Sequence, residues 1–294
     1  MSPRDLALAV IATLILGVNF AVVKVAVGYA PPVFVTALRF AFVSLALIWF
    51  FPPSKMPPGL WRGVLVFSVF QGLLHHGAMY IGIRGVDAAI GSIIMQLGTP
   101  FALLFAWWLL GEKFGWRRSM GLLVAFAGVA ILIGEPDVWA ANYFVTFLII
   151  SALCWGFVNA YVKRLGEVNI LQLTAWYAVF AVPQLLIASA VFETGQWDAA
   201  MAAPLQFWAL IGFMSLGATI TAYGIWYYLI GRYSMAHMVP FALLNPVIGA
   251  LSGIILLGEN MTWEKIAGGV IVLVGVAIIQ LRGKRTVSPN SSGD

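Results

Sequence analysis

The sequence predicts an all-α, polytopic membrane protein whose ten transmembrane helices form two inverted five-helix repeats around a central cavity. Three observations support this fold class: an apolar composition, a succession of long apolar runs, and motifs that recur in both halves of the chain. Hydrophobic residues make up 62% of the 294 residues, and charged residues make up only 9%. A soluble domain contains about 25% charged residues, so this chain cannot cover itself with a water-compatible surface.

Apolar runs of about 20 residues recur from one end of the chain to the other, and a helix of that length crosses a hydrocarbon core of roughly 30 Å. The runs lack the alternation of polarity that transmembrane barrels show over about ten residues. Proline, glycine and acidic residues separate them, as at Pro31-Pro32 and Pro52-Pro53. The predicted spans are residues 6–27, 33–51, 62–83, 88–110, 115–134, 143–163, 170–191, 205–229, 234–257 and 264–281.

The formal net charge is +5, but the basic residues are few and dispersed among apolar segments, so the sequence predicts no binding to nucleic acid. When alternate loops are assigned to opposite sides of a bilayer, one side receives twelve Lys and Arg residues and the other receives three. Cytoplasmic loops are enriched in Lys and Arg. We therefore expect a multi-pass protein of a bacterial inner membrane with both termini in the cytoplasm.

The two halves of the chain repeat several motifs in the same order. An offset of 147 residues relates Gly111-Glu112 to Gly258-Glu259, Trp116 to Trp263 and Tyr80 to Tyr227. Each half contains five spans, an odd number, so the second half must be inverted relative to the first, as in many secondary transporters. We expect a first repeat over residues 1–138, an inverted second repeat over 139–282 and a cytoplasmic tail over 283–294.

Several of these motifs resemble the drug/metabolite transporter superfamily in its ten-helix form. The matching elements are the stretches Gly17 to Lys24 and Leu38-Arg39-Phe40, Pro100 followed by Leu110-Gly111-Glu112, and Pro246 followed by Leu257-Gly258-Glu259. The resemblance covers residues 5–282, and within the superfamily the chain is similar to bacterial aromatic amino-acid exporters. A Trp-Gly pair usual in the first half appears here as Leu16-Gly17, whereas Trp155-Gly156 in the second half is intact.

The resemblance implies a carrier that exports small metabolites, with aromatic amino acids favoured, by alternating access. It also implies that the first, third, fourth, sixth, eighth and ninth spans surround the central cavity. The fifth and tenth spans would pack away from the cavity, where their small residues permit close contact between helices.

Polar side chains inside the spans are costly in a bilayer, so each one needs a partner or a water-filled cavity. In the third span, His76 and Tyr80 share one helical face, whereas His75 points about 100° away. We expect His76 and Tyr80 to contact substrate; the alternative is a histidine that only bonds to a neighbouring backbone group. Adjacent histidines lack the i, i+4 spacing with which two ligands share a metal, so we expect no metal site.

Four amide side chains lie on helices that the resemblance places around the cavity: Asn19, Gln96, Asn159 and Asn245. We expect them to bind substrate, with ordinary hydrogen bonds between helices as the alternative for each. Pro100 and Pro246 occupy equivalent places in the two halves, and a proline within a span frees a backbone carbonyl. We expect these two prolines to form pliable points that take part in gating.

Aromatic side chains gather in the sixth and eighth spans, where Trp155, Tyr223, Trp226 and Tyr227 lie. The last three follow helical spacing and form one stripe, which predicts either packing against lipid or core, or the wall of a cavity for a flat hydrophobic substrate. In such a wall, stacking contributes about 0.5–1.5 kcal/mol per aromatic pair. We count Trp155, Tyr223 and Tyr227 among the expected substrate-binding residues.

Arg39 is the one permanent charge well inside a predicted span, where an unpaired charge costs about 2.5–3.5 kcal/mol or more. The superfamily resemblance places an arginine here, so a structural or gating role with a partner near the outer face is expected. Binding of a substrate carboxylate is the alternative.

None of the eleven acidic residues lies near the middle of a predicted span, whereas ion-driven transporters commonly use a buried carboxylate. We therefore expect a facilitator without tight ion coupling and without a cofactor. One alternative is a proton-linked efflux carrier for drugs or hydrophobic cations. A membrane-embedded enzyme is the other, although the spans hold no recognisable catalytic set. The expected partners are a small-molecule substrate, an amino acid or a similar hydrophobic metabolite, and the lipid bilayer; the oligomeric state stays open.

Overall fold

The computed structural model describes residues 1–53, 56–166, 168–233 and 235–280, and within these ranges it leaves out the side chains of residues 227, 231, 235 and 236. The described part of the chain is almost entirely helical and contains no strand. In chain order the elements are α1 (Pro3–Tyr29), α2 (Pro32–Leu47), η2 (Pro58–Leu60), α3 (Trp61–Phe67), η3 (Ser68–Gly77), α4 (Ala78–Gly85), α5 (Ala88–Ile94), η4 (Met95–Leu97), α6 (Gly98–Leu110), α7 (Trp116–Ile133), α8 (Pro136–Ala140), α9 (Asn142–Arg164), α10 (Ile170–Phe192), α11 (Gln196–Ala202), α12 (Leu205–Gly212), η5 (Phe213–Ala222), α13 (Tyr223–Arg232), α14 (Met235–Leu257) and α15 (Trp263–Gln280).

The predicted polytopic helical fold is confirmed. In the described residues, nine helical stretches are long and apolar enough to cross a membrane, and α2 is a shorter apolar helix. The predicted second span was too long, because α2 ends at Leu47 and the chain continues in turns, with Phe50 N donating to Leu47 O and Phe51 N to Ile48 O. The proline that follows Phe51 explains the early end, since a residue before proline disfavours the helical conformation.

Two kinds of element were absent from the sequence-based prediction. The loops after α7 and α10 contain the short helices α8 and α11. The third and eighth spans each contain a ten-residue π-helical segment, η3 and η5, in which the backbone bonds skip one residue more than in an α-helix. Both segments lie inside their spans and at similar places in the two halves of the chain.

The repeated Leu-Gly-Glu motif forms the same helix end in both halves. Gly111 and Gly258 adopt left-handed conformations with φ of 66° and 69°, which glycine reaches without steric cost. The following N–H groups reach back six residues, from Glu112 to the carbonyl of Ala106 and from Glu259 to that of Gly253. The glycine N–H groups bond to Trp107 and Ile254, so at each helix end a left-handed glycine lets two backbone donors satisfy the last carbonyls.

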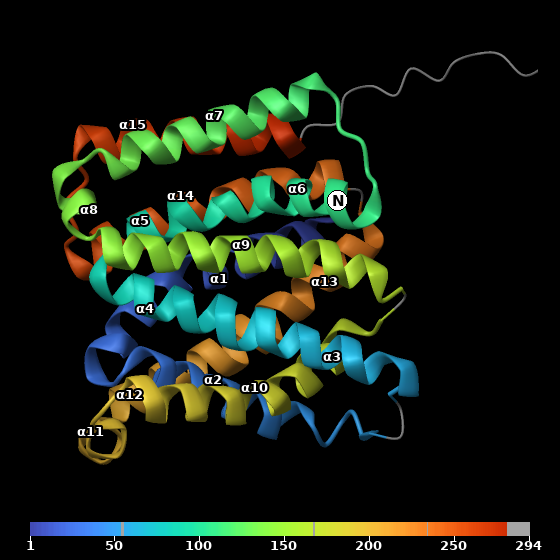
Figure 1. Ribbon diagram of the computed structural model, residues 1–294, viewed down its shortest axis with the longest axis vertical. Coiled ribbons are helices and arrows are strands. Elements are labelled where there is room, and N and C mark those ends of the chain that lie inside the picture. The colour runs from blue at the N-terminus through green and yellow to red at the C-terminus, as the bar shows by residue number, and fades with distance from the viewer. Residues whose placement is uncertain (54–55, 167, 234, 281–294) are drawn as a thin grey trace, which may run out of the picture.

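Helix packing follows the same repetition (Figure 1). Helix α1 packs against α14 and η5, and in the other half α9 packs against α6 and η3. Helix α2 packs against α10, and α7 against α15. Helix α1 is the repeat equivalent of α9, and η5 and α14 are the equivalents of η3 and α6, so the contacts of α1 correspond to those of α9. The pairs α2 with α10 and α7 with α15 each join two equivalent helices. That is the pattern expected from two inverted repeats related by an approximate two-fold axis.

Helices α7 and α15 lie side by side at the top edge of Figure 1 and approach closely through glycine. A Cβ atom added at Gly128 would lie 2.6 Å from the backbone nitrogen of Val272, and one added at Gly275 would overlap the backbone of Ala125. Van der Waals packing between close backbones is a main source of helix association in lipid. The expected close contact between the fifth and tenth spans is therefore present.

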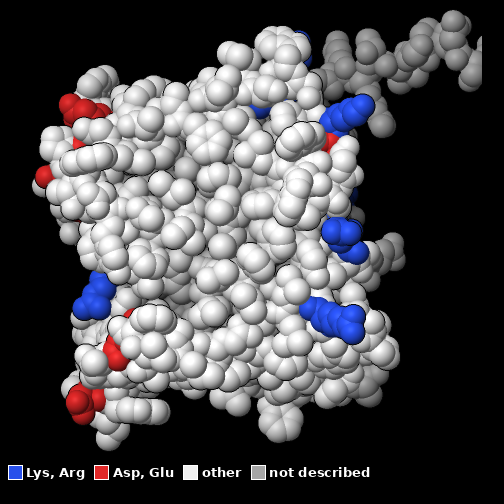
Figure 2. Space-filling model, in the orientation of Figure 1, with Lys and Arg blue, Asp and Glu red and all other residues white. Residues whose placement is uncertain are grey.

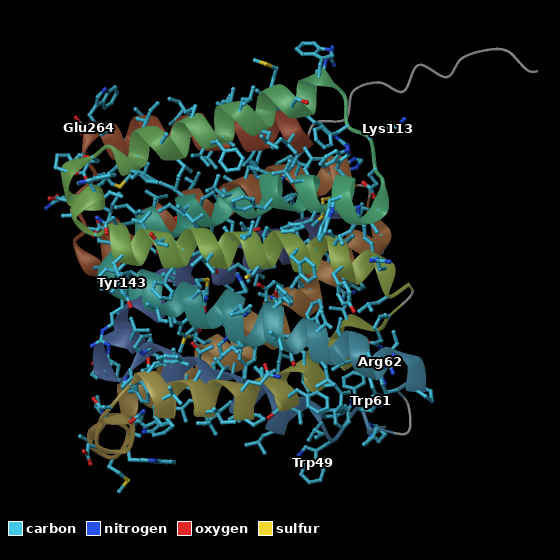
Figure 3. All side chains as sticks on the ribbon, viewed as in Figure 1. Trp49, Trp61, Arg62, Lys113, Tyr143 and Glu264 are labelled. Atoms are coloured by element: carbon cyan, nitrogen blue, oxygen red, sulfur yellow. The ribbon has the colours of Figure 1, made fainter. Side chains whose placement is uncertain are left out.

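Apart from Arg39, the charged side chains lie mostly at the two ends of the bundle. In Figure 2 acidic side chains gather along the left edge, whereas basic side chains predominate along the right edge. In Figure 3 Lys113 and Arg62 lie at one end of the helices and Glu264 lies at the other. We refer to these as the basic end and the acidic end.

We predict that Gly275→Ala destabilises the protein by about 1–3 kcal/mol, because the added methyl group would force α7 and α15 apart. The matched control is Gly212→Ala, since no atom lies within 4 Å of a Cβ atom added at Gly212. Thermal unfolding in detergent, followed by fluorescence, measures both. An unchanged melting temperature for Gly275→Ala would show that the contact between α7 and α15 tolerates separation.

Candidate functional site

Arg39 lies within the bundle, and only 2% of its surface is exposed. Its Nε and one terminal nitrogen both donate to Thr219 Oγ1, at 3.1 and 2.8 Å, and the other terminal nitrogen donates to Tyr80 OH at 2.7 Å. Arg39 comes from α2, Tyr80 from α4 and Thr219 from η5. The guanidinium therefore joins helices from both halves of the chain.

The hydroxyl groups around Arg39 are in turn fixed by neighbours on η5. Tyr80 OH donates to the sulfur of Met214 at 3.2 Å, and Thr219 Oγ1 donates to the carbonyl of Met214 at 2.9 Å. Ser215 donates to the backbone carbonyl of Arg39 at 3.0 Å. Tyr80 and Thr219 thus accept from the guanidinium and donate to Met214, whereas Ser215 holds the backbone of Arg39.

No carboxylate of the described residues pairs with Arg39. The ion pairs in this part of the chain join Lys163 to Glu112 at 3.1 Å and Lys265 to Asp87 at 2.9 Å, both near the ends of helices. A buried charge without a counter-ion is expensive in a medium of low dielectric constant. Among its described hydrogen-bond partners, Arg39 is held by neutral oxygen atoms alone.

Aromatic rings surround the guanidinium. Its central carbon lies 5.9 Å from the ring centres of both Phe40 and Tyr80, within the range of cation–π attraction. Phe40 meets the rings of His76 and Tyr177 edge to face, with centres 5.0 and 5.6 Å apart. The two expected substrate-binding residues His76 and Tyr80 are thus neighbours of Arg39 in one aromatic and cationic cluster.

The π-helical segments place two members of this cluster. In η3 the ring Nδ1 of His76 lies 2.7 Å from the carbonyl of Gln71, and in η5 the hydroxyl of Thr219 bonds to the carbonyl of Met214 at 2.9 Å. Both bonds span five residues, the interval of a π-helical turn. Each side chain bonds to a backbone carbonyl within its own π-helical turn, and this bond fixes the orientation of the side chain.

The two adjacent histidines contact different helices. His75 lies 3.1 Å from the carbonyl and 2.9 Å from the hydroxyl of Ser151 on α9, whereas His76 packs on Phe40 of α2. Their ring centres are 4.4 Å apart. The two side chains thus point in different directions from η3, as expected for adjacent helical positions. Both rings have hydrogen-bond partners on the backbone.

The four amides differ in their partners. Asn159 donates to the carbonyl of Trp155 on its own helix α9 at 2.7 Å, a bond within one helix that is not the bond between helices expected as the alternative. Asn19 is buried and Asn245 is partly buried, and the side-chain oxygen of each has no hydrogen-bond donor among the described residues. Gln96 is partly buried in the short turn η4. Asn19 and Asn245 are therefore the two amides with an unfilled acceptor.

The aromatic residues of the sixth and eighth spans do not form a single wall. The ring of Trp155 covers Gly98, where any side chain would overlap it. Trp226 packs in a small cluster with Ala9 and Leu229. Tyr223 is partly buried at the start of α13, and the side chain of Tyr227 lies outside the described residues.

Both expected gating prolines are buried, but their settings differ. Pro100 stands in the first turn of α6, just after η4, where proline costs a helix little. Pro246 lies inside α14, and its carbonyl accepts a bond of 3.2 Å from the hydroxyl of Ser92 on α5. Only Pro246 therefore interrupts the hydrogen bonds of a long helix interior.

The two Gly-Glu turns have different contacts at the two ends of the bundle. At the acidic end, the carboxylate of Glu259 accepts from the first N–H groups of α5, from Ala88 at 2.6 Å and from Ala89 at 3.1 Å. At the basic end, Glu112 is exposed and pairs with exposed Lys163. Of the two equivalent glutamates, Glu259 thus joins two helices through backbone N–H groups, whereas Glu112 forms an ion pair exposed to solvent.

A second glutamate closes the acidic end. The carboxylate of Glu193, after α10, accepts from the backbone nitrogens of Val33 and Phe34 at 2.8 and 3.0 Å, at the start of α2. Negative charge at the start of a helix is favourable, because the free N–H groups and the helix dipole both attract it. Two helix starts are therefore tied to neighbouring helices at this end.

The structure contains a surface hollow at each end. The one at the acidic end, of about 440 Å³, is lined by Gly28, Tyr29, Ala30, Pro31, Arg84, Phe192, Glu193, Thr194, Gly195 and Ala199. The one at the basic end, of about 250 Å³, is lined by Thr99, Ala102, Leu103, Ala106, Glu112, Arg118, Lys163, Val239, Ile279 and Gln280. Among the described residues, no group of three or more His, Cys, Asp or Glu side chains could hold a metal ion.

Sequence reasoning missed several members of the site. Thr219 and Ser215 look like ordinary small polar residues in an apolar run, and nothing in their spacing points to Arg39. Gln71 is buried, and its side-chain oxygen also lacks a described donor. The Gly-Glu repeat drew attention to Glu259, but its contact with the start of α5 depends on how two helices are placed in space.

Comparison with known proteins extends these observations. The chain is 27% identical to a protein of Salmonella typhimurium named "Probable amino-acid metabolite efflux pump", with 95% of each chain covered. It is 26% identical to a protein of Escherichia coli with the same name, over 99% of this chain and 100% of that one. A solved structure described as "Crystal structure of protein" superposes with a TM-score of 0.63 at 16% identity, over 95% of this chain and 96% of the other, which supports the fold.

The model of the EamA-like transporter family matches the chain twice, over residues 5–134 and 142–281. The two matches cover most of the sequence, and the gap between them, residues 135–141, contains α8. The expected resemblance to the drug/metabolite transporter superfamily is thereby confirmed, and with it the assignment to multi-pass inner-membrane transporters. The chain belongs to the EamA-like transporter family.

Proposed function

We propose that this protein exports small metabolites, amino acids and in particular aromatic ones, by alternating access and without tight coupling to an ion. Family membership supports carriage across a membrane, and the two relatives named as amino-acid metabolite efflux pumps support the substrate class. The proposed units are a first repeat over residues 1–138 and an inverted repeat over 139–282. The proposed cytoplasmic tail, 283–294, lies outside the described residues.

The main observation in support of alternating access is that the two equivalent Gly-Glu turns make different contacts at the two ends of the bundle. Glu259 binds the start of α5, and its equivalent Glu112 is exposed at the other end. Helix α14 starts at Met235, which follows the first residue of α5, Ala88, by the same 147 residues that separate Glu112 from Glu259. In the proposed cycle, Glu112 caps the start of α14 when the basic end closes, and Glu259 then releases α5.

The charge distribution gives this cycle a direction. Basic loops lie on the cytoplasmic side of membrane proteins, so the proposal places the basic end and both termini in the cytoplasm. The acidic end, which Glu193 and Glu259 tie together, then faces outwards. In the proposal, these two ties close the described state at its outer end, although a hollow lined by Arg84 and Glu193 lies there too. The hollow lined by Lys163 and Arg118 then lies on the side from which an exporter takes its substrate.

The described spans also support transport without a tightly coupled ion. The acidic residues with described contacts, such as Asp87, Glu193 and Glu259, lie at helix ends. His75 and His76 are each bonded to a backbone carbonyl, which occupies one ring nitrogen. A proton-linked carrier of drugs or hydrophobic cations is the rival within the superfamily. A membrane-embedded enzyme is the rival from another class, and membership of a transporter family speaks against it.

We predict saturable counterflow of phenylalanine and tryptophan in proteoliposomes, faster than that of threonine or of a drug cation, with no stoichiometric movement of protons. His76→Ala should raise the KM for phenylalanine by about two- to tenfold, because an aromatic contact is worth about 0.5–1.5 kcal/mol. His237→Ala, at an exposed histidine, is the control. Proton flux tightly coupled to substrate, read with a pH-sensitive dye inside the vesicles, would instead favour the proton-linked carrier.

We predict opposite effects of neutralising the two repeated glutamates. Glu259→Gln loses charge-assisted bonds to α5, each worth about 1.5–3 kcal/mol, so the outward-open population should rise about tenfold or more. In a Cys154→Ser background, Ser92→Cys reports on the outer path because Ser92 is buried beside α14. An impermeant maleimide added outside should label it faster after Glu259→Gln.

Glu112→Gln provides the matched control in the same background. It should leave labelling of Ser92→Cys from outside unchanged or slower, since in the proposed cycle Glu112 stabilises only the outward-open state. Equal acceleration by both substitutions would show general loosening of the protein and would argue against the alternating use of the two turns.

A further inference from the structure

We infer that Arg39 is the binding residue for the carboxylate of the exported substrate, so that the site selects aromatic carboxylates and amino acids over amines that lack the acid group. The inference rests on the proposed function and names the chemistry by which that function selects its substrate. It assigns to Arg39 a binding role in place of a purely structural one.

The first argument is charge. Arg39 is a permanent cation, nearly fully buried, and its described hydrogen bonds lead to Thr219 and Tyr80, which are both neutral. An arginine has five N–H donors in a planar fork that matches a carboxylate. The described bonds occupy three of these donors. A carboxylate supplies both the missing negative charge and further acceptors, and charge-assisted bonds of this kind are about twice as strong as neutral ones.

The second argument is position. The partners of Arg39 belong to opposite repeats, since Tyr80 lies on α4 and Thr219 on η5. Movement of one repeat against the other would break the two bonds to Thr219 and release Nε and one terminal nitrogen together. These two nitrogens form one edge of the guanidinium fork. A carboxylate that binds this edge would exchange places with Thr219, which links substrate binding to the movement of the repeats.

The third argument is shape. The ring of Phe40 follows Arg39 in the sequence, and His76 and Tyr177 pack against it edge to face. A substrate whose carboxylate sits on Arg39 therefore has aromatic faces and edges within reach of its own side chain. Aromatic pairs prefer such edge-to-face or offset arrangements. The cluster suits a flat ring attached to an acid group.

The fourth argument is the supply of acceptors for an ammonium group. Asn19 on α1 and Gln71 on η3 are both more than nine-tenths buried, and the side-chain oxygen of each lacks a donor among the described residues. Helix α1 packs against η5, and η3 packs against α2. A buried unfilled acceptor is costly. An amino group would donate to such an oxygen, so a zwitterion would supply both a negative group for Arg39 and a donor for a buried acceptor.

The test compares three ligands that share one ring: phenylalanine, phenylpropionate, which lacks the amine, and phenylethylamine, which lacks the carboxylate. Their affinities for the purified full-length protein are measured by the shift of its melting temperature in detergent. Phenylalanine and phenylpropionate should both stabilise the protein, and phenylethylamine should bind about tenfold more weakly or worse. Equal stabilisation by phenylethylamine and phenylpropionate would overturn the inference without recourse to any variant.

Substitution at Arg39 separates charge from geometry. Arg39→Gln should remove the preference for phenylpropionate over phenylethylamine, and Arg39→Lys should reduce it, because lysine keeps the charge but loses the fork. Arg62→Gln is the matched control, since Arg62 is exposed at the basic end and should leave the preference intact. A folded Arg39→Gln protein that keeps the full carboxylate preference would assign Arg39 a structural role alone.

Counterflow in proteoliposomes distinguishes failure of this inference from failure of the proposed function. Export of phenylalanine and phenylethylamine at equal rates by the wild-type protein would uphold export and overturn the role of Arg39. Selective, Arg39-dependent binding of phenylpropionate with no counterflow of any amino acid would uphold the carboxylate site and overturn amino-acid export.

Discussion

The burial of one positive charge between the two repeats constrains the centre of this structure. A guanidinium cannot remain unsolvated inside a membrane, so α4 and η5 must bring hydroxyl groups to Arg39 from opposite halves of the chain. Those hydroxyls are oriented by Met214, and the rings of Phe40 and Tyr80 shield the charge. Neutral groups satisfy only part of what a buried cation requires, and it is this remainder that the inferred carboxylate of the substrate would supply.

The π-helical segments explain how an otherwise apolar bundle can present polar groups at this point. An α-helix would turn successive side chains by about 100° and keep its carbonyls occupied. In η3 and η5 the widened turn leaves a carbonyl that His76 or Thr219 occupies from five residues away. Single π-helical turns are frequently found at functional sites. Here each repeat contributes one, and both lie against α2, which carries Arg39.

Sequence reasoning predicted the features that depend on local chemistry. The spans followed from run length, and their boundaries from proline and glycine; α2 was overestimated because an apolar tail, with Trp49 82% exposed, lies outside the helix. The Gly-Glu turns were found as a repeat, since a left-handed glycine leaves a recognisable residue type. Thr219, the π-helical segments and the contact of Glu259 with α5 were not predicted. They arise from the placement of helices distant in sequence, and a threonine or alanine carries no signal of that placement.

The two glutamate turns have the same local structure but different contacts, and the proposed cycle assigns that difference to the state of the protein and not to the sequence of either turn. In the described state, Glu259 makes two charge-assisted bonds to the start of α5, whereas Glu112 makes an exposed ion pair, and exposed pairs contribute about 0–1 kcal/mol. A repeat-swapped state would exchange these contributions nearly one for one. The free-energy difference between the two states then stays small, and differential binding of a substrate can shift the populations. Under the proposed function, such a carrier would need no ion to reset it, because its empty forms would interconvert at little cost and the substrate gradient alone would set the direction of net flow.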